Sequence, residues 1–114
     1  MANSFKSETD KEIGTSTATV FTCASSTETT IIGLSVANRV SSQILIDVEL
    51  DASTRTSGAE DKVFLVKDAP IPVGGSLVVV GGDQKLVMEP GDTIKVTSDT
   101  ATSADVVVSH LDIT

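Results

Sequence analysis

The single histidine, His110, is the first residue to weigh as a catalytic group, because imidazole is the commonest acid or base near neutral pH. It lies in the run VVVSHLDI and shares one face of an expected strand with Val106 and Val108. No nucleophile stands at a recognisable spacing from it, and the GxSxG elbow of serine hydrolases is missing. These residues predict a structural or interface histidine, and a chain that is not an enzyme.

Three carboxylates form the second candidate site. Asp47, Glu49 and Asp51 recur at every second position, so in a strand they share one face at spacings of roughly 6 to 7 Å. Oxygen ligands of this kind suit Ca²⁺ or Mg²⁺, but the EF-hand calcium loop is absent. The pattern predicts a solvated acidic face with no metal and no other cofactor, and it keeps a divalent ion here as the minor alternative.

The only cysteine, Cys23, has no partner for a disulfide within its own chain. A free cysteine in an alternating apolar stretch usually packs as a small hydrophobic residue. We therefore expect Cys23 in the core, and assembly of the protein in a reducing, intracellular place.

The glycine-rich segment GGDQK, residues 81–85, is a candidate for a phosphate-binding loop. It lacks the GxxxxGK[ST] spacing, and no helical pattern follows it that would aim backbone N–H groups at an anion. We interpret this segment as a turn.

The charge balance excludes several partners. Eight basic against sixteen acidic residues give a net charge of −8, and the isoelectric point is about 4.3. Such a chain is repelled by nucleic-acid phosphates and by anionic membrane surfaces. The sequence also shows no apolar run long enough to span a membrane and no signal-peptide pattern. We expect no nucleic acid and no membrane among its partners.

The elements that position these residues are strands, because Val, Ile and Thr make up about a third of the chain. From Ile13 onward, short alternating runs are separated by Gly, Pro, Asp or Ser at the spacing of a sandwich or barrel. The sequence predicts one all-β domain, an antiparallel β-sandwich of about eight strands with jelly-roll or immunoglobulin-like topology. The expected strands are residues 15–24, 29–38, 43–52, 62–69, 77–80, 85–89, 92–98 and 104–113.

The N-terminal segment differs from the rest of the chain. Among residues 1–12 only Met1 and Phe5 are sizeable apolar groups, too few to bury a face. We therefore predict a flexible, extended arm over residues 1–12 and the β-sandwich domain over residues 13–114. An arm of this kind can exchange between copies at a sheet edge.

Two turns have a mechanism in their residues. In Glu89–Asp92, Pro90 presets the backbone at the second position, and Gly91 supplies the positive φ that a type II turn requires at the third. Gly81 and Gly82 permit the positive φ values of a primed hairpin turn or its bulged variant.

Two further connections are expected. Pro70 and Pro72 each lack a backbone donor, which predicts an extended, unpaired crossing from one sheet to the other. Residues 52–61 are polar and aperiodic, which predicts a long solvated loop. Small residues at Gly33, Ser35 and Ala37 share one face of their strand, so another surface could approach it closely.

The run Phe64–Thr114 resembles small virion structural proteins of tailed bacteriophages, notably those that infect cyanobacteria. The similarity lies in an IP-x-G-x-SL strand, the GGDQK segment, the EPGD turn and a DV-x-x-S-x-L-x-IT ending. It extends more loosely back to Thr29, while residues 1–28 match nothing in that family. The resemblance implies a β-sandwich located in the virion, assembled in the host bacterial cytoplasm.

The resemblance also implies a function. We expect a capsid cement or decoration protein that binds across capsomer junctions of the head shell. Its partners would be the major capsid protein or other virion proteins, and it would form a homo-oligomer, with a trimer favoured. A neck, tail or fibre-attachment protein is the alternative within that class. A carbohydrate-binding module is the alternative from another class, although Trp and Tyr are absent.

Four residues are candidate partner contacts: Phe5, Ile13, Arg39 and Arg55. Arginines and aromatic or large apolar groups are natural anchors on a surface that is otherwise acidic and poor in aromatics. For each of them, an ordinary surface or core position is the alternative interpretation.

Overall fold

Alternation in the sequence becomes alternating burial in the computed structural model, which describes residues 3–55 and 61–114. In the strand Ile44–Asp51, the side chains of Ile44, Ile46 and Val48 are fully buried, while the alternating Asp47 and Glu49 face outward. The predicted inward and outward faces of this strand are confirmed.

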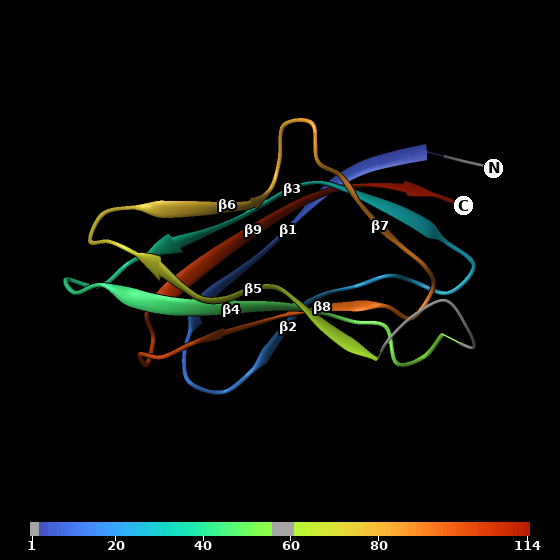
Figure 1. The fold of residues 1–114 in the computed structure, drawn as a ribbon. Helices are drawn as coiled ribbons and strands as arrows, with labels where there is room; N and C mark the ends of the chain where they lie inside the picture. The colour runs from blue at the N-terminus through green and yellow to red at the C-terminus, as the bar shows by residue number, and fades with distance from the viewer. Residues whose placement is uncertain (1–2, 56–60) are drawn as a thin grey trace.

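Two antiparallel sheets pack face to face as a β-sandwich (Figure 1). One sheet has the order β1-β9-β3-β6, with β7 also paired to β3, and the other has the order β2-β8-β4-β5. With β6 and β7 counted as one interrupted strand, this is the strand order of a jelly roll. The described residues form nine strands: β1 (Asn3–Ile13), β2 (Ala18–Thr22), β3 (Glu28–Asn38), β4 (Ile44–Asp51), β5 (Lys62–Ile71), β6 (Ser76–Val80), β7 (Leu86–Met88), β8 (Thr93–Ser98) and β9 (Ala104–Ile113).

The core lies between the sheets and draws on both of them. Its fully buried larger side chains come from β3, β4, β7, β8 and β9 and from the end of β5. Because the described residues form no α-helix, none of them could make a membrane-spanning helix. All eight strands expected from the sequence are present.

The ninth strand corrects one prediction. Residues 3–12, expected within a flexible arm, belong to β1, which runs antiparallel to β9 from the pair Asn3–Ile113 to the pair Asp10–Val106. Composition gave no sign of this strand, because its side chains are mostly exposed and only Ile13 is buried. The segment is a strand because its backbone pairs with β9, and no pattern of side chains in the sequence indicates such pairing.

The sequence predicts a hairpin turn in the segment from Gly81 to Lys85, but this segment does not connect two paired strands. Both β6 and β7 pair antiparallel to β3, so they lie in line along it and the segment between them bulges from the sheet edge (Figure 1). The turn itself is of the primed kind, because Gly82 has a φ of 61° and Gln84 N–H donates to the Gly81 carbonyl at 3.1 Å.

The predicted passage between sheets occurs, but not as an unpaired extended segment. Pro70 lies within β5 opposite Leu45, which is tolerated because β5 is an edge strand. Pro72 opens a tight turn in which Gly75 N–H donates to its carbonyl at 2.9 Å, before the chain enters β6 in the other sheet. Of the expected loop over residues 52–61, residues 56–60 lie outside the described part of the chain.

The turn at Glu89–Asp92 is confirmed. Gly91 has a φ of 90°, and Asp92 N–H donates to the Glu89 carbonyl at 3.0 Å, as a type II turn requires. A Cβ atom at Gly91 would also lie 2.6 Å from Thr54 Oγ1, so glycine serves both the dihedral and the packing.

Replacing Gly91 with alanine should lower the free energy of unfolding by about 3 kcal/mol, from positive-φ strain and a clash with Thr54. Gly74→Ala is the matched control, because Gly74 has a φ of 72° with nothing within 4 Å of an added Cβ, and should cost about 1 kcal/mol. Urea unfolding followed by far-ultraviolet circular dichroism measures both. Equal losses would contradict the close packing of Gly91 on Thr54.

Candidate interaction face

The central part of the outer surface of the five-stranded sheet is built from uncharged side chains, with Glu28 opposite Ile113 at one end and Asp105 opposite Ala37 at the other. Residues directly opposite in an antiparallel pair point to the same side, so the register defines rows across the sheet. One row runs Phe5, Leu111, Thr30 and Val87, from β1 through β9 and β3 to β7. Phe5 is 75% exposed and Val87 is 64% exposed, so the row ends in large apolar groups open to solvent.

A second row carries the same character across the other end of the sheet. Thr9 lies opposite Val107, which pairs with Ser35, which in turn pairs with Val78. Val78 is 65% exposed and Val107 is 45% exposed. Between the rows lie Ser7, Ser109 and Gly33. We call this surface the uncharged face, made of Phe5, Ser7, Thr9, Thr30, Gly33, Ser35, Val78, Val87, Val107, Ser109 and Leu111.

The outer surface of the four-stranded sheet is of the opposite kind. Its strands present charged side chains that pair with one another: Asp47 with Lys67 at 3.2 Å and Asp51 with Lys95 at 3.0 Å. The Lys67 ammonium also lies 5.1 Å from the centre of the exposed Phe64 ring. We call this surface the charged face, made of Asp47, Glu49, Asp51, Lys62, Phe64, Lys67 and Lys95.

The three alternating carboxylates share the outer side of β4, as predicted, but they do not converge on one point. Asp51 is not solvated as expected, because it is only 9% exposed. Asp47 accepts hydrogen bonds from Lys67 and from the Asp68 backbone N–H at 2.8 Å, so its oxygens are engaged. Asp51 accepts from Lys95 and from the Ser53 backbone N–H at 3.0 Å. Residues 3–55 and 61–114 contain no group of three His, Cys, Asp or Glu side chains that could hold a metal ion.

His110 lies in the core, between two carboxylates and an aromatic ring. Its side chain is 1% exposed, with Nδ1 at 2.8 Å from Asp112 Oδ1 and Nε2 at 3.1 Å from Glu8 Oε2. The Phe21 ring centre lies 4.4 Å from that of the imidazole. The contact between Nε2 and Glu8 joins β9 to β1, while the contact between Nδ1 and Asp112 lies within β9.

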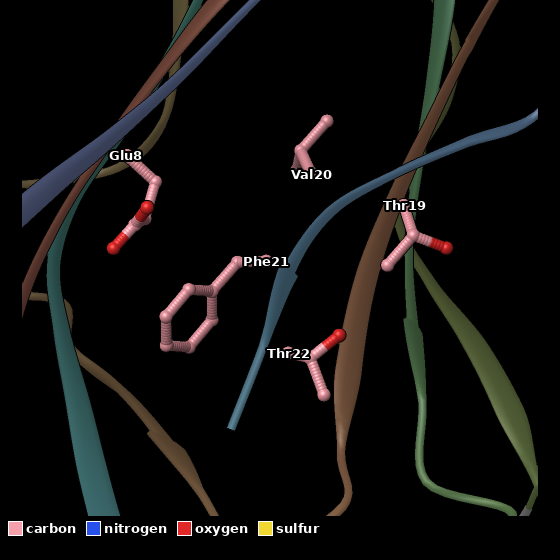
Figure 2. A pocket seen from close by; sticks show the side chains of 5 residues that line it. All are labelled: Glu8, Thr19, Val20, Phe21 and Thr22. Atoms are coloured by element: carbon pink, nitrogen blue, oxygen red, sulfur yellow. The ribbon is translucent and has the colours of Figure 1, made fainter. Parts of the chain in front are cut away.

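A shallow hollow lies beside this cluster. It has a volume of about 330 Å³ and is lined by Glu8 of β1 and by Thr19, Val20, Phe21 and Thr22 of β2. Figure 2 shows Glu8 reaching across from β1 toward the Phe21 ring, with the two threonines on the far side of β2. Because His110 itself lies behind Phe21 with both nitrogens engaged, the hollow exposes one carboxylate and no acid–base pair.

Cys23 is buried as expected, with 1% of its surface exposed. Its sulfur lies 3.3 Å from the Thr27 carbonyl oxygen and 3.3 Å from Thr29 Oγ1. Burial raises the pKa of the Cys23 thiol, which keeps the sulfur protonated and unreactive.

Two of the four expected contact residues lie on β1, in opposite environments. Phe5 stands on the uncharged face and is largely exposed, which fits a contact role. Ile13 is 3% exposed and belongs to the core, so its expected role as a surface anchor is wrong. The strand turns inward at this point, after a register shift between Asp10 and Ile13.

The two arginines are held within the chain. Arg39 Nη1 lies 3.1 Å from Asp105 Oδ1 and 3.8 Å from Glu12 Oε1, at a half-exposed site. The Arg55 side chain is only 15% exposed and forms an ion pair with the fully buried Asp92 carboxylate. Its Nε lies 3.1 Å from both carboxylate oxygens. This ion pair gives Arg55 a structural role, joining the end of β4 to the Glu89–Asp92 turn.

The sequence indicated only part of the uncharged face. The small residues at Gly33, Ser35 and Ala37 pointed to it, but Val78, Val87 and Val107 were not recognised as exposed. In a run such as VVV, both sides of the strand are apolar, so alternation alone does not say which side faces solvent. Once β1 and β9 are paired, the register assigns Val107 to the outside.

Comparisons with known proteins supply no relative. No family model matches the chain, and no curated protein or solved structure matches it. The uncharged face is therefore interpreted from its own residues and geometry.

Removing the Arg55 side-chain charge should be costly, because Asp92 would stay buried without its cation. Arg55→Met should lower the free energy of unfolding by about 3 kcal/mol, the usual cost of breaking a buried pair. Arg39→Met, at a half-exposed pair, is the control and should cost less than about 1 kcal/mol. Similar losses in urea unfolding would contradict the structural assignment of Arg55.

Acid should destabilise the fold in part through Asp51. Hydrogen bonds from Ser53 and then from Lys95 hold the pKa of this carboxyl well below its usual range. Its contribution is therefore complete above about pH 4, the unfolded value, and is lost as pH falls below that. The unfolding free energy of Asp51→Asn should change less between about pH 6 and about pH 3 than that of wild type.

The matched control for this acid dependence is Asp83→Asn, because Asp83 lies exposed in the turn after β6. It should retain the wild-type difference between the two pH values. An Asp51→Asn protein with the full wild-type difference would show that this carboxyl does not contribute.

Proposed function

We propose that this chain is a non-enzymatic structural protein of a tailed-phage virion, a capsid cement or decoration protein that docks through its uncharged face. The observation that carries the proposal is the contrast between the two outer surfaces of one sandwich. The charged face carries two ion pairs, Asp47–Lys67 and Asp51–Lys95, beside one exposed ring, Phe64. The uncharged face instead leaves four large apolar side chains exposed: Phe5, Val78, Val87 and Val107. Charged residues are depleted at the centres of protein interfaces, so the uncharged face has the composition of a contact surface.

The size of this face fits a protein partner. Four strand positions at about 4.8 Å and five residues along each strand, Phe5–Thr9 on β1, at roughly 3.3 Å give a surface of about 300 Å². A standard interface buries about 800 Å² on each partner, so this face would form the centre of one. The side chains near the centre of the face are small, namely Gly33, Ser35 and Ser109, so a flat partner surface can approach the sheet closely.

Two further observations support a role without catalysis. His110 is buried with both ring nitrogens engaged, and Cys23 is buried with its thiol protonated, so neither is offered to a substrate. The shallow hollow between β1 and β2 presents a carboxylate without a partner acid or base. A structural protein that functions by binding other proteins does not need an accessible imidazole, thiol or acid–base pair.

The fold is compatible with the resemblance but does not by itself choose between two roles. Jelly rolls recur in viral capsid and in lectin domains, an analogy of fold that favours a capsid role and a sugar-binding role equally. A sugar site usually needs an open aromatic platform. Phe21 is buried in the core and Phe64 carries the Lys67 ammonium near its ring, so Phe5 alone is left for stacking. This favours the structural role.

Decoration also explains why a small, weakly adhesive face is enough. A shell repeats one docking site many times, and each bridged junction adds its own modest free energy. The acidic chain is repelled by the packaged genome, which leaves the protein free to bind on the shell. The proposed partners are accordingly the major capsid protein or other virion proteins.

A cryo-electron microscopy reconstruction of virions of the phage that encodes this chain tests the proposed place. The expected result is density for the sandwich at capsomer junctions, with the uncharged face against the shell. Density restricted to the neck, tail or fibre base would establish the alternative position. Particles without this chain would contradict the virion role.

A pair of matched substitutions tests the face itself. Thr30 lies on the uncharged face between Leu111 and Val87, and Thr93 lies on the outer side of β8 in the other sheet. Thr30→Arg should weaken binding to capsids at least about tenfold, because a charge is buried in an apolar contact. Thr93→Arg should bind as wild type. Equal binding by the two variants, both checked for folding by circular dichroism, would contradict docking through this face.

A further inference from the structure

The four sheet edges of the sandwich are not equally protected against pairing with another chain. The β6–β7 edge is interrupted by a loop, and β6 has a register shift against β3. The β5 edge contains two register shifts and Pro70, and the β2 edge is five residues long with a shift of its own. Interruptions, bulges and prolines are the usual means of blocking strand addition.

The fourth edge, β1, has none of these features over most of its length. Residues Asn3–Asp10 pair with β9 in eight consecutive register positions without a shift. Their outward-facing backbone groups pair with no other strand among the described residues. Such a continuous edge is a template for a further strand.

The side chains of β1 determine which charges an added strand must carry. Lys6 and Glu8 point to the inner side of the sheet, opposite His110 and Val108. Lys6 makes no ion pair within the described part of the chain, and Glu8, half-exposed at the hollow beside β2, uses one oxygen for His110. Charges along an edge oppose pairing unless the incoming strand places the opposite charge against each of them.

A second copy of β1 meets this requirement in one register. Opposite residues in an antiparallel pair must point to the same side, so even-numbered positions pair with even-numbered ones. Centring the pair on Lys6 or on Glu8 places like charges opposite each other. Centring it on Ser7 places Lys6 of each copy opposite Glu8 of the other, which makes two favourable pairs and no unfavourable one.

We propose that β1 pairs antiparallel with β1 of a second copy about a twofold axis at Ser7, joining the two five-stranded sheets into one. The inference rests on the proposed function and deepens it by naming a partner. A contact that pairs with itself closes as a dimer, so it replaces the trimer implied by the resemblance.

The dimer has a consequence for docking. An axis perpendicular to the sheet keeps both uncharged faces on the same side, so their combined area is doubled and continuous. In this register Phe5 of each copy lies opposite Thr9 of the other, which covers an aromatic ring that is 75% exposed in the single chain. One dimer then presents two docking faces to a shell, as bridging between neighbouring subunits requires.

Light scattering coupled to size-exclusion chromatography on the full chain tests the pairing. Wild type should show a concentration-dependent mass of two chains. Lys6→Glu replaces both favourable pairs with Glu opposite Glu, and should raise the dissociation constant at least about tenfold. Mixing Lys6→Glu with Glu8→Lys should restore a dimer, because each strand then meets the opposite charges.

The matched control is Lys11→Glu, which makes the same change of charge on the same strand but lies opposite Asn3 in this register. It should dimerise as wild type does, and circular dichroism confirms that each variant is folded. A monomeric or trimeric wild type, or equal effects of Lys6→Glu and Lys11→Glu, would overturn the proposal.

The two proposals fail separately. Capsid binding by a chain that stays monomeric would retain the decoration role and exclude β1 pairing. A dimer lost on Lys6→Glu, in a protein absent from virions, would retain the pairing and exclude decoration.

Discussion

Backbone pairing of β1 along β9 is the constraint on which the rest of the molecule depends. It adds a full-length strand to one sheet, and it does so with almost no apolar burial from β1 itself beyond Ile13. The same pairing places Phe5 on the uncharged face and carries Glu8 to His110. Without β1, His110 and the inner side of β9 would stand at an open edge of the sandwich.

The outer surfaces of the two sheets differ in chemical character. On the four-stranded sheet, Asp47 and Asp51 each meet a lysine from a neighbouring strand, so the charges are satisfied within the chain and keep that side hydrated. On the five-stranded sheet, Val87 and Val107 have no such reason to be exposed. The proposed partner would cover this face, since exposed apolar patches often mark interaction sites. The interrupted β6–β7 edge and the proline in β5 meanwhile leave β1 as the edge that the proposed pairing uses.

The sequence predicted the sandwich well and its surfaces poorly, for physical reasons. The alternation in β4 and the turn chemistry of Pro90 and Gly91 are local properties, so they are legible without a structure. The β1 strand depends on backbone pairing with a segment about a hundred residues away, which no local pattern encodes. The turn at Gly82 has hairpin chemistry, yet β3 supplies the partner for both flanking strands, so the topology overrides the turn. Ile13 was misassigned because a single isoleucine beside polar residues carries no periodicity.

Hydrogen exchange of the β1 amides, resolved by nuclear magnetic resonance, tests the central claim most directly. The account predicts that, in dilute protein, alternate amides between Asn3 and Asp10 exchange slowly because they donate to β9. The intervening amides should become protected as the concentration rises and the second copy pairs with them. Exchange of the whole segment at the rate of an unfolded chain, at every concentration, would contradict it.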